Sequence, residues 1–177
     1  YVGYGLKHLF EFSQDYTDIS QKDTTDHKQW DFSGVYSNFS IPLWKIRAGG
    51  HYMENNDTAS NHTWTAITGL HYIGSYNYDA GVDAFVTKYT ARNPTLWVYQ
   101  ISPHVGFNFM RDTRSSWRND ITGYWIYHNK NVGLEDRHFY SVEDSLHYYW
   151  HKWTFGVNGW LGRQSFAVGK GGFVVFN

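Results

Sequence analysis

The side chains best suited to chemistry in this 177-residue chain are ten histidines, 15 lysines and arginines, and 16 acidic residues. The chain has no cysteine, so a disulfide, a thiolate metal site and a cysteine nucleophile are all excluded. Alternation of apolar and polar residues places some of the charged and histidine side chains on the polar faces of predicted strands. The candidate residues for a lumen or binding site are Lys45, Arg47, Asp79, Asp83, His104, Glu143 and His147.

Opposite charges in this set predict pairing across neighbouring strands, because an unpaired charge is costly to bury. We expect Lys45 and Arg47 to face acidic partners, which are Asp79, Asp83 or Glu143. The simplest interpretation is that these groups fill the interior of a narrow barrel. Two other interpretations stay open: a permeation path or binding site lined by titratable groups, and catalysis.

The catalytic interpretation has weak support in the sequence. A serine hydrolase needs an imidazole beside the hydroxyl, and the nearest pair on one strand face is Ser102 with His104. Side chains at positions i and i+2 of a strand lie about 6–7 Å apart, too far for a direct hydrogen bond. The acidic stretch 23–27 lacks the spacing of a known metal motif and is typical of a solvated loop. The sequence therefore favours a protein without catalytic residues, metal site or cofactor.

The elements that must position these groups are strands. The alternation predicts about ten of them, and it is clearest over 96–110, where the odd positions from Trp97 to Phe109 carry no polar side chain. No apolar run approaches the roughly 20 residues of a membrane-spanning helix. The predicted strands lie near 2–14, 30–41, 44–53, 63–74, 78–90, 96–110, 120–129, 138–150, 153–161 and 165–176.

Aromatic residues and connections point to a membrane. Tyrosine, tryptophan and phenylalanine make up 20% of a chain that is polar on average, and aromatic rings favour membrane–water interfaces. Seven of the nine tryptophans sort to the two ends of the predicted strands. Three long polar connections, 15–29, 54–62 and 130–137, alternate with tight turns, so we expect them outside the cell. A short break at 92–94 and a long one at 111–119 depart from this alternation.

These features resemble bacterial outer-membrane β-barrels as a class. The ending Phe173-Val-Val-Phe-Asn177 resembles the terminal strand that the assembly machinery of that membrane recognises, although the barrel signal usually ends on the aromatic residue. The resemblance is architectural, covers the whole chain and singles out no particular family. It implies a single domain over 1–177, an all-β, closed, antiparallel, transmembrane up-and-down barrel of about ten strands in the bacterial outer membrane.

Four functions follow from that expectation. The first is a narrow or plugged porin-type channel for passive passage of small solutes, with the lipid bilayer and lipopolysaccharide as partners. The others are a scaffold whose loops bind a protein partner, an outer-membrane hydrolase acting on lipid or peptide, and a soluble lipocalin-like binding barrel. Balanced charge, with 15 basic and 16 acidic side chains, gives no basic surface for nucleic acid.

Overall fold

The computed structural model describes residues 2–4, 7–20, 26–57, 60–75, 77–92, 94–109, 112, 114–131, 133, 136–168 and 174–175. Every regular element among these residues is a β-strand, as the alternating pattern predicts. The described residues include no helix long and apolar enough to cross a membrane. The strands are β1 (Val2–Tyr4), β2 (His8–Ile19), β3 (His27–Asn38), β4 (Trp44–Asn55), β5 (Thr63–Tyr72), β6 (Tyr78–Tyr89), β7 (Leu96–Phe109), β8 (Ser115–His128), β9 (His138–Trp150), β10 (Trp153–Gly162), β11 (Ala167–Val168) and β12 (Val174–Val175).

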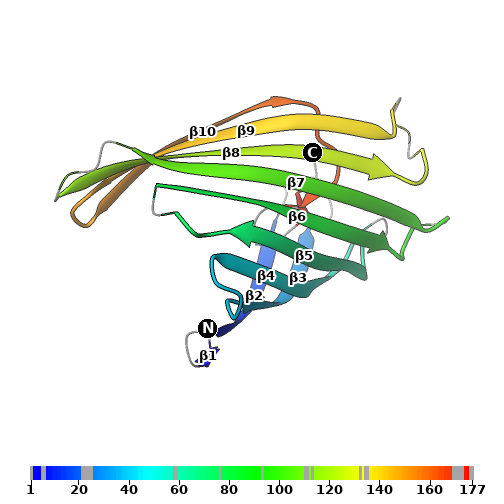
Figure 1. The fold of residues 1–177 in the computed structure, drawn as a ribbon. Helices are drawn as coiled ribbons and strands as arrows, with labels where there is room; N and C mark the ends of the chain where they lie inside the picture. The colour runs from blue at the N-terminus through cyan, green and yellow to red at the C-terminus, as the bar shows by residue number, and fades with distance from the viewer. Residues whose placement is uncertain are drawn as a thin grey trace.

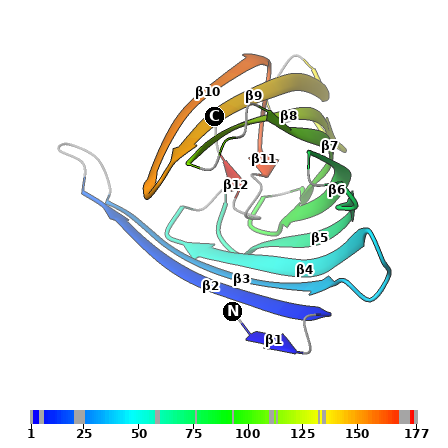
Figure 2. The same ribbon diagram turned by 60° about the vertical axis from the view of Figure 1, so that its left-hand side comes forward.

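Strands β1 to β10 form one antiparallel sheet in which each strand pairs with the next one along the chain. The sheet curls strongly and so has a concave and a convex face (Figures 1 and 2). The connections after β3, β5, β7 and β9 lie at one end of the strands, which we call the short-turn end. The connections after β2, β4, β6 and β8 lie at the other, the long-loop end.

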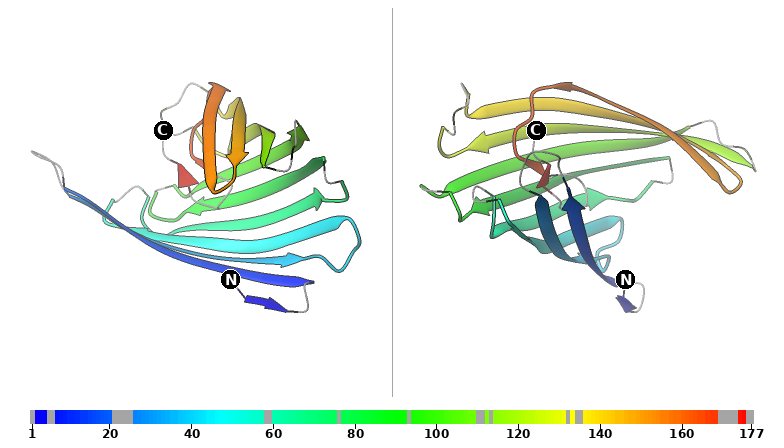
Figure 3. Two further views of the ribbon diagram at one scale, coloured as in Figure 1. Left: turned by 90° about the vertical axis from the view of Figure 1, so that its left-hand side faces the viewer. Right: turned by 180° about the vertical axis from the view of Figure 1, so that it is seen from behind.

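The sheet is open, whereas the sequence predicts a closed barrel. Within the described residues no ladder joins β10 to β1 or β2, and these strands form the two margins of the sheet (Figure 3). The difference arises after β10, where Gly162 adopts a positive φ of 120° and the chain leaves the sheet. The described residues of the predicted last strand 165–176, which are 165–168 and 174–175, therefore do not extend the sheet, and its other residues lie outside the described part of the chain. Instead β11 and β12 pair with each other as a separate small sheet, which lies on the concave side (Figure 2).

Most strand boundaries match the prediction within two residues. The larger differences lie at the start of the chain, at β3, which is His27–Asn38 where 30–41 is predicted, and at β8. The predicted strand 2–14 is divided into β1 and β2, and β2 continues to Ile19 because its polar second half pairs fully with β3. The predicted loop 15–29 is therefore shorter. Strand β8 begins at Ser115, so the connection from β7 is shorter than the predicted break at 111–119, in keeping with the short connection that the alternation predicts there.

The two faces of the sheet have inverted polarity. Along β7, Tyr99, Ile101 and Phe107 are exposed on the convex face, while Gln100 and Ser102 are buried on the concave face. Ile101 is 39% exposed and Ser102 is 5% exposed. The concave side buries serines, threonines, histidines and aspartates, whereas large apolar side chains cover the convex side.

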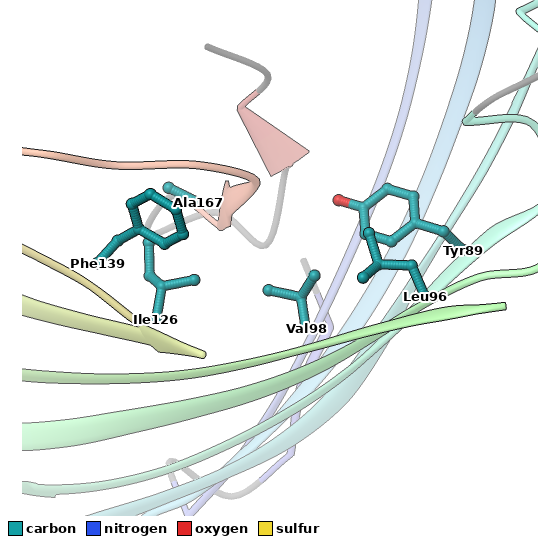
Figure 4. Close-up of a cluster of buried hydrophobic side chains, with 6 residues drawn as sticks. All are labelled: Tyr89, Leu96, Val98, Ile126, Phe139 and Ala167. Carbon is teal, nitrogen blue, oxygen red and sulfur yellow. The ribbon is translucent and has the colours of Figure 1, made fainter. Parts of the chain in front are cut away.

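Residues 165–168, which we call the interior segment, fill part of the concave side. Gln100 accepts a hydrogen bond from the Val168 backbone N–H and donates one to the Val168 carbonyl, both at 2.8 Å. Ala167 packs with apolar side chains of β6 to β9 (Figure 4), and Val168 packs against Val35, Ile67 and Phe85. The apolar core of the molecule is thus formed between the sheet and its own C-terminal region.

Candidate functional site

A charged cavity of about 240 Å³ lies on the concave face, toward the short-turn end. Strands β4 to β8 each contribute side chains to it, and Val168 of the interior segment also lines it. Its lining residues are Lys45, Arg47, His71, Asp79, Asp83, Phe85, Ser102, His104, Arg118, Asp120, Thr122, Tyr124 and Val168.

Strand register explains why these groups meet. The ladders align Lys45, His71, Gly81, His104 and Thr122 across five neighbouring strands. Residues two apart on one strand face the same side, so a parallel row containing the next charged groups runs beside this one. One neighbouring row holds Arg47, Gly69, Asp83 and Ser102, and the row on the opposite side holds Asp79, Gly106 and Asp120, so at least three adjacent rows build the cavity.

Glycines in these rows let long polar side chains reach across an intervening strand. Arg47 on β4 and Asp83 on β6 are both paired in register with Gly69 on β5. A Cβ atom on Gly69 would collide with the Asp83 carboxylate. Because Gly69 has none, the Arg47 guanidinium donates to both Asp83 oxygens, at 3.3 and 3.5 Å.

Two ion-pair clusters balance the charge of the cavity. In the first, Asp83 contacts Arg47 at 3.3 Å and His71 at 2.9 Å. In the second, Arg118 contacts Asp79 and Asp120, both at 2.7 Å. With neutral imidazoles, the three cationic side chains that line the cavity, Lys45 among them, offset its three carboxylates.

Five of the seven candidate residues from the sequence line this cavity: Lys45, Arg47, Asp79, Asp83 and His104. The predicted pairing of Arg47 with Asp83 is confirmed. Asp79, however, pairs with Arg118 on β8, a residue absent from the candidate set.

The other two candidates lie outside the lining. Glu143 accepts a hydrogen bond from the Tyr124 hydroxyl, and the His147 ring stacks against Tyr149 on the same strand. Both belong to β9, one strand beyond the cavity wall.

The sequence missed Arg118 and Asp120 for different reasons. Arg118 lies in a stretch predicted as a loop, so it was assigned to no strand face. Asp120 is the first residue of the predicted strand 120–129. Because β8 begins at Ser115, Arg118 and Asp120 lie two positions apart on one strand and share a face. His71 was recognisable as a polar-face residue of its strand, and its contact with Asp83 depends on a register that the sequence alone does not fix.

Comparison with protein-family models, curated proteins and solved structures gives no match for this chain. Its function must therefore be inferred from the fold and from the geometry of the cavity.

Proposed function

We propose that the chain is a bacterial outer-membrane β-barrel protein with a narrow, partly plugged interior that admits small polar solutes. The observation that carries this proposal is the inverted polarity of the sheet. A soluble lipocalin-like barrel would bury apolar side chains on its concave face and expose polar ones. Here buried groups such as His51, Asp83 and Gln100 line the concave face, while exposed groups such as Leu70 and Ile101 cover the convex face. That arrangement is the one expected when lipid surrounds the convex face.

Aromatic side chains on the convex face support the same proposal. At the short-turn end of the sheet, Trp44 packs on Tyr72 at a centroid distance of 5.5 Å. At the long-loop end, Tyr52 packs on Trp64 at 4.4 Å. Trp44 and Tyr52 are eight positions apart on β4, which is about 27 Å along a strand. At a tilt of about 35–45° this length spans roughly 19–22 Å across the membrane, close to the apolar band of about 25 Å found between aromatic girdles.

Further ring contacts follow each end of the sheet. The short-turn end carries the pairs Phe109–Trp117 and Trp117–Tyr148. The long-loop end carries Tyr16–Trp30 and Tyr99–Tyr127. Rings with one apolar and one polar edge are stabilised where lipid meets water.

The interior supports a narrow passage better than a wide pore. The ion-pair clusters bridge several strands at the short-turn end, and the interior segment packs against the concave face nearer the long-loop end. Barrels of about eight strands are already filled by side chains, so one or two more strands leave little open cross-section.

Reconstitution into planar lipid bilayers tests this function. We expect the refolded full chain to resist extraction from liposomes by alkaline carbonate and to give small, salt-dependent conductance steps. A chain that folds without detergent and stays out of liposomes would contradict the membrane assignment.

The interior segment favours one second candidate function, a closed scaffold barrel whose loops bind a protein partner. The bilayer experiment separates the two functions, because a scaffold would insert stably without conducting.

A further inference from the structure

We propose that His71, Asp83 and His104 form a binding site for a divalent transition-metal ion, with Zn²⁺ as the probe. Each residue offers one ligating atom, and the three atoms lie within 4.8 Å of one another. Among the described residues, this is the group of histidines and carboxylates that meets that condition. Two imidazoles and one carboxylate form a ligand set typical of zinc sites.

Strand pairing brings the two imidazoles together. His71 on β5 and His104 on β7 are both paired with Gly81 on β6. A Cβ atom on Gly81 would lie 2.8 Å from His104 Cε1 and 2.9 Å from His71 Cγ, so only glycine leaves room for both rings. The ring centroids are 4.6 Å apart. Asp83 follows two positions later on the same face of β6, and its carboxylate lies 2.9 Å from His71 Nε2.

The spread of the ligating atoms is close to that of a bound ion. Zinc–ligand bonds of about 2.0–2.2 Å place the ligands of a tetrahedral ion roughly 3.4 Å apart. The largest permitted separation here, 4.8 Å, therefore needs to close by only a little over an ångström. All three residues lie at the wall of the cavity, so the proposal requires only rotation of their side chains.

The surroundings allow a cation despite the nearby basic groups. Arg47 contacts Asp83 through long hydrogen bonds of 3.3 and 3.5 Å, which leave lone pairs on the carboxylate for a metal. Such an outer partner also orients a ligating carboxylate. Arg118 is held by Asp79 and Asp120, so its charge is already offset.

Three protein ligands leave at least one coordination position for water or an anionic solute group. The ion would also link strands β5, β6 and β7. Metal binding to the native state stabilises it by mass action, so the ion should act as a clamp on the middle of the sheet.

The test titrates ZnCl₂ into the refolded full chain in detergent micelles, after treatment with EDTA, and follows binding by calorimetry. We expect one zinc ion per chain and an increase in the unfolding temperature. The variants His71→Ala and His104→Ala should each weaken binding at least about tenfold, a loss comparable to that for removing outer-shell partners. Absorption of a Co²⁺-loaded sample supplies a second readout of nitrogen and oxygen ligation.

His147→Ala is the matched control, because the His147 imidazole lies on β9, outside the cavity lining. It should bind zinc as the wild type does. The proposal is overturned if the folded wild type binds no zinc, or if His104→Ala binds it as tightly as His147→Ala. The variant Asp83→Asn removes the carboxylate ligand but also the partner of Arg47. If this variant does not fold, the two histidine variants decide the outcome. Zinc binding is measured in micelles and does not depend on conductance. A protein that conducts no ions in bilayers can therefore still bind zinc in this test.

Discussion

Arg47 and Asp83 form the ion pair on which the cavity depends most, because both side chains are largely removed from water. Their side chains are 14% and 9% exposed. Replacing Arg47 by glutamine leaves the Asp83 carboxylate buried beside the imidazoles of His71 and His104, with no guanidinium to offset its charge. We expect Arg47→Gln to lower the free energy of unfolding by about 1–3 kcal/mol, below the full cost of breaking a deeply buried pair. Urea titration of the refolded protein measures this change in the free energy of unfolding.

A double-mutant cycle separates the ion pair from general damage. In Arg47→Gln/Asp83→Asn no unpaired charge remains, so the double variant should lose less stability than the sum of the single losses. Strict additivity would mean that the two side chains do not interact energetically, contrary to their contact.

Asp112 gives a pH prediction outside the strands. The backbone N–H of Arg114, the backbone N–H of Ser115 and the Ser115 hydroxyl all donate to its carboxylate. These hydrogen bonds hold the pKa of Asp112 below its usual value of 3.8. The stabilisation is thus fully present above that value and is lost as pH falls through the lower folded pKa.

The Ser115 amide resonance, followed by NMR in micelles, should therefore titrate with a midpoint below 3.8. The variant Asp112→Asn should abolish this titration. A midpoint at or above the usual value would show that the turn does not hold the charged form.

At the scale of the strand, the facing of β7 is the most direct test of lipid contact. Ile101 is exposed on the convex face near the middle of its strand. In a bilayer, Ile101→Arg should destabilise the protein by about 2–4 kcal/mol, because arginine would enter the hydrocarbon region. On a water-exposed surface the same change should stay within about 0.5 kcal/mol. Refolding titrations into lipid vesicles distinguish the two.

Ile41→Arg is the matched control. Ile41 is also exposed, at 51%, but lies in the turn between β3 and β4, beyond the aromatic residues of the short-turn end. It should tolerate arginine. Equal tolerance at both positions would contradict a lipid-facing β7.

The interior segment depends on Gln100, which holds Val168 by two hydrogen bonds. Gln100→Ala removes both and should destabilise the packing of residues 165–168 by about 1–3 kcal/mol. We expect faster cleavage by added protease within this segment and larger conductance steps in bilayers. Unchanged conductance together with faster cleavage would indicate that the segment does not obstruct the passage.

Period-two alternation predicted most strands of this sheet, since most long strands have one apolar and one polar face, but it missed the polar second half of β2 and the start of β8. It did not predict the path of residues 165–168. A run such as Phe166-Ala-Val168 has the same pattern whether it pairs in a sheet or packs against a concave face. The sequence also could not predict which charged residues of the cavity pair with one another. Asp79 on β6 meets Arg118 on β8 because of the two registers that join these strands through β7, and a one-residue shift in either would separate them.

For the whole molecule, closure is the central question, and strand direction limits the answers. Eight successive antiparallel pairings make β2 and β10 run in the same direction. An up-and-down barrel therefore needs a strand of opposite direction between them. Strand β1 has that direction but pairs with β2 over only three positions.

We expect that in a membrane the two margins approach to two strand spacings, about 10 Å. The chain has no cysteine, so pairs of cysteines introduced for cross-linking react without interference from native thiols. The variant Val157→Cys on β10 is combined with one second cysteine on β2 at a time. The second substitutions are Phe10→Cys, Phe12→Cys and Gln14→Cys. Several positions are needed because closing a sheet staggers its edges. One of these pairs should be joined by a bifunctional maleimide of about that length in liposomes, and none in urea.

Phe12 with Gly50 is the positive control, since the ladders place these residues two strands apart on β2 and β4. Phe12 with Ile101 is the negative control, because four strands of the sheet, β3 to β6, lie between them. If the control pair is joined but no β2–β10 pair is, the margins stay apart in the bilayer. Exposed ladder groups along both margins would then be unsatisfied in lipid, where each costs several kcal/mol. An open sheet is therefore incompatible with a transmembrane location, and this cross-linking result decides the membrane proposal as directly as conductance does.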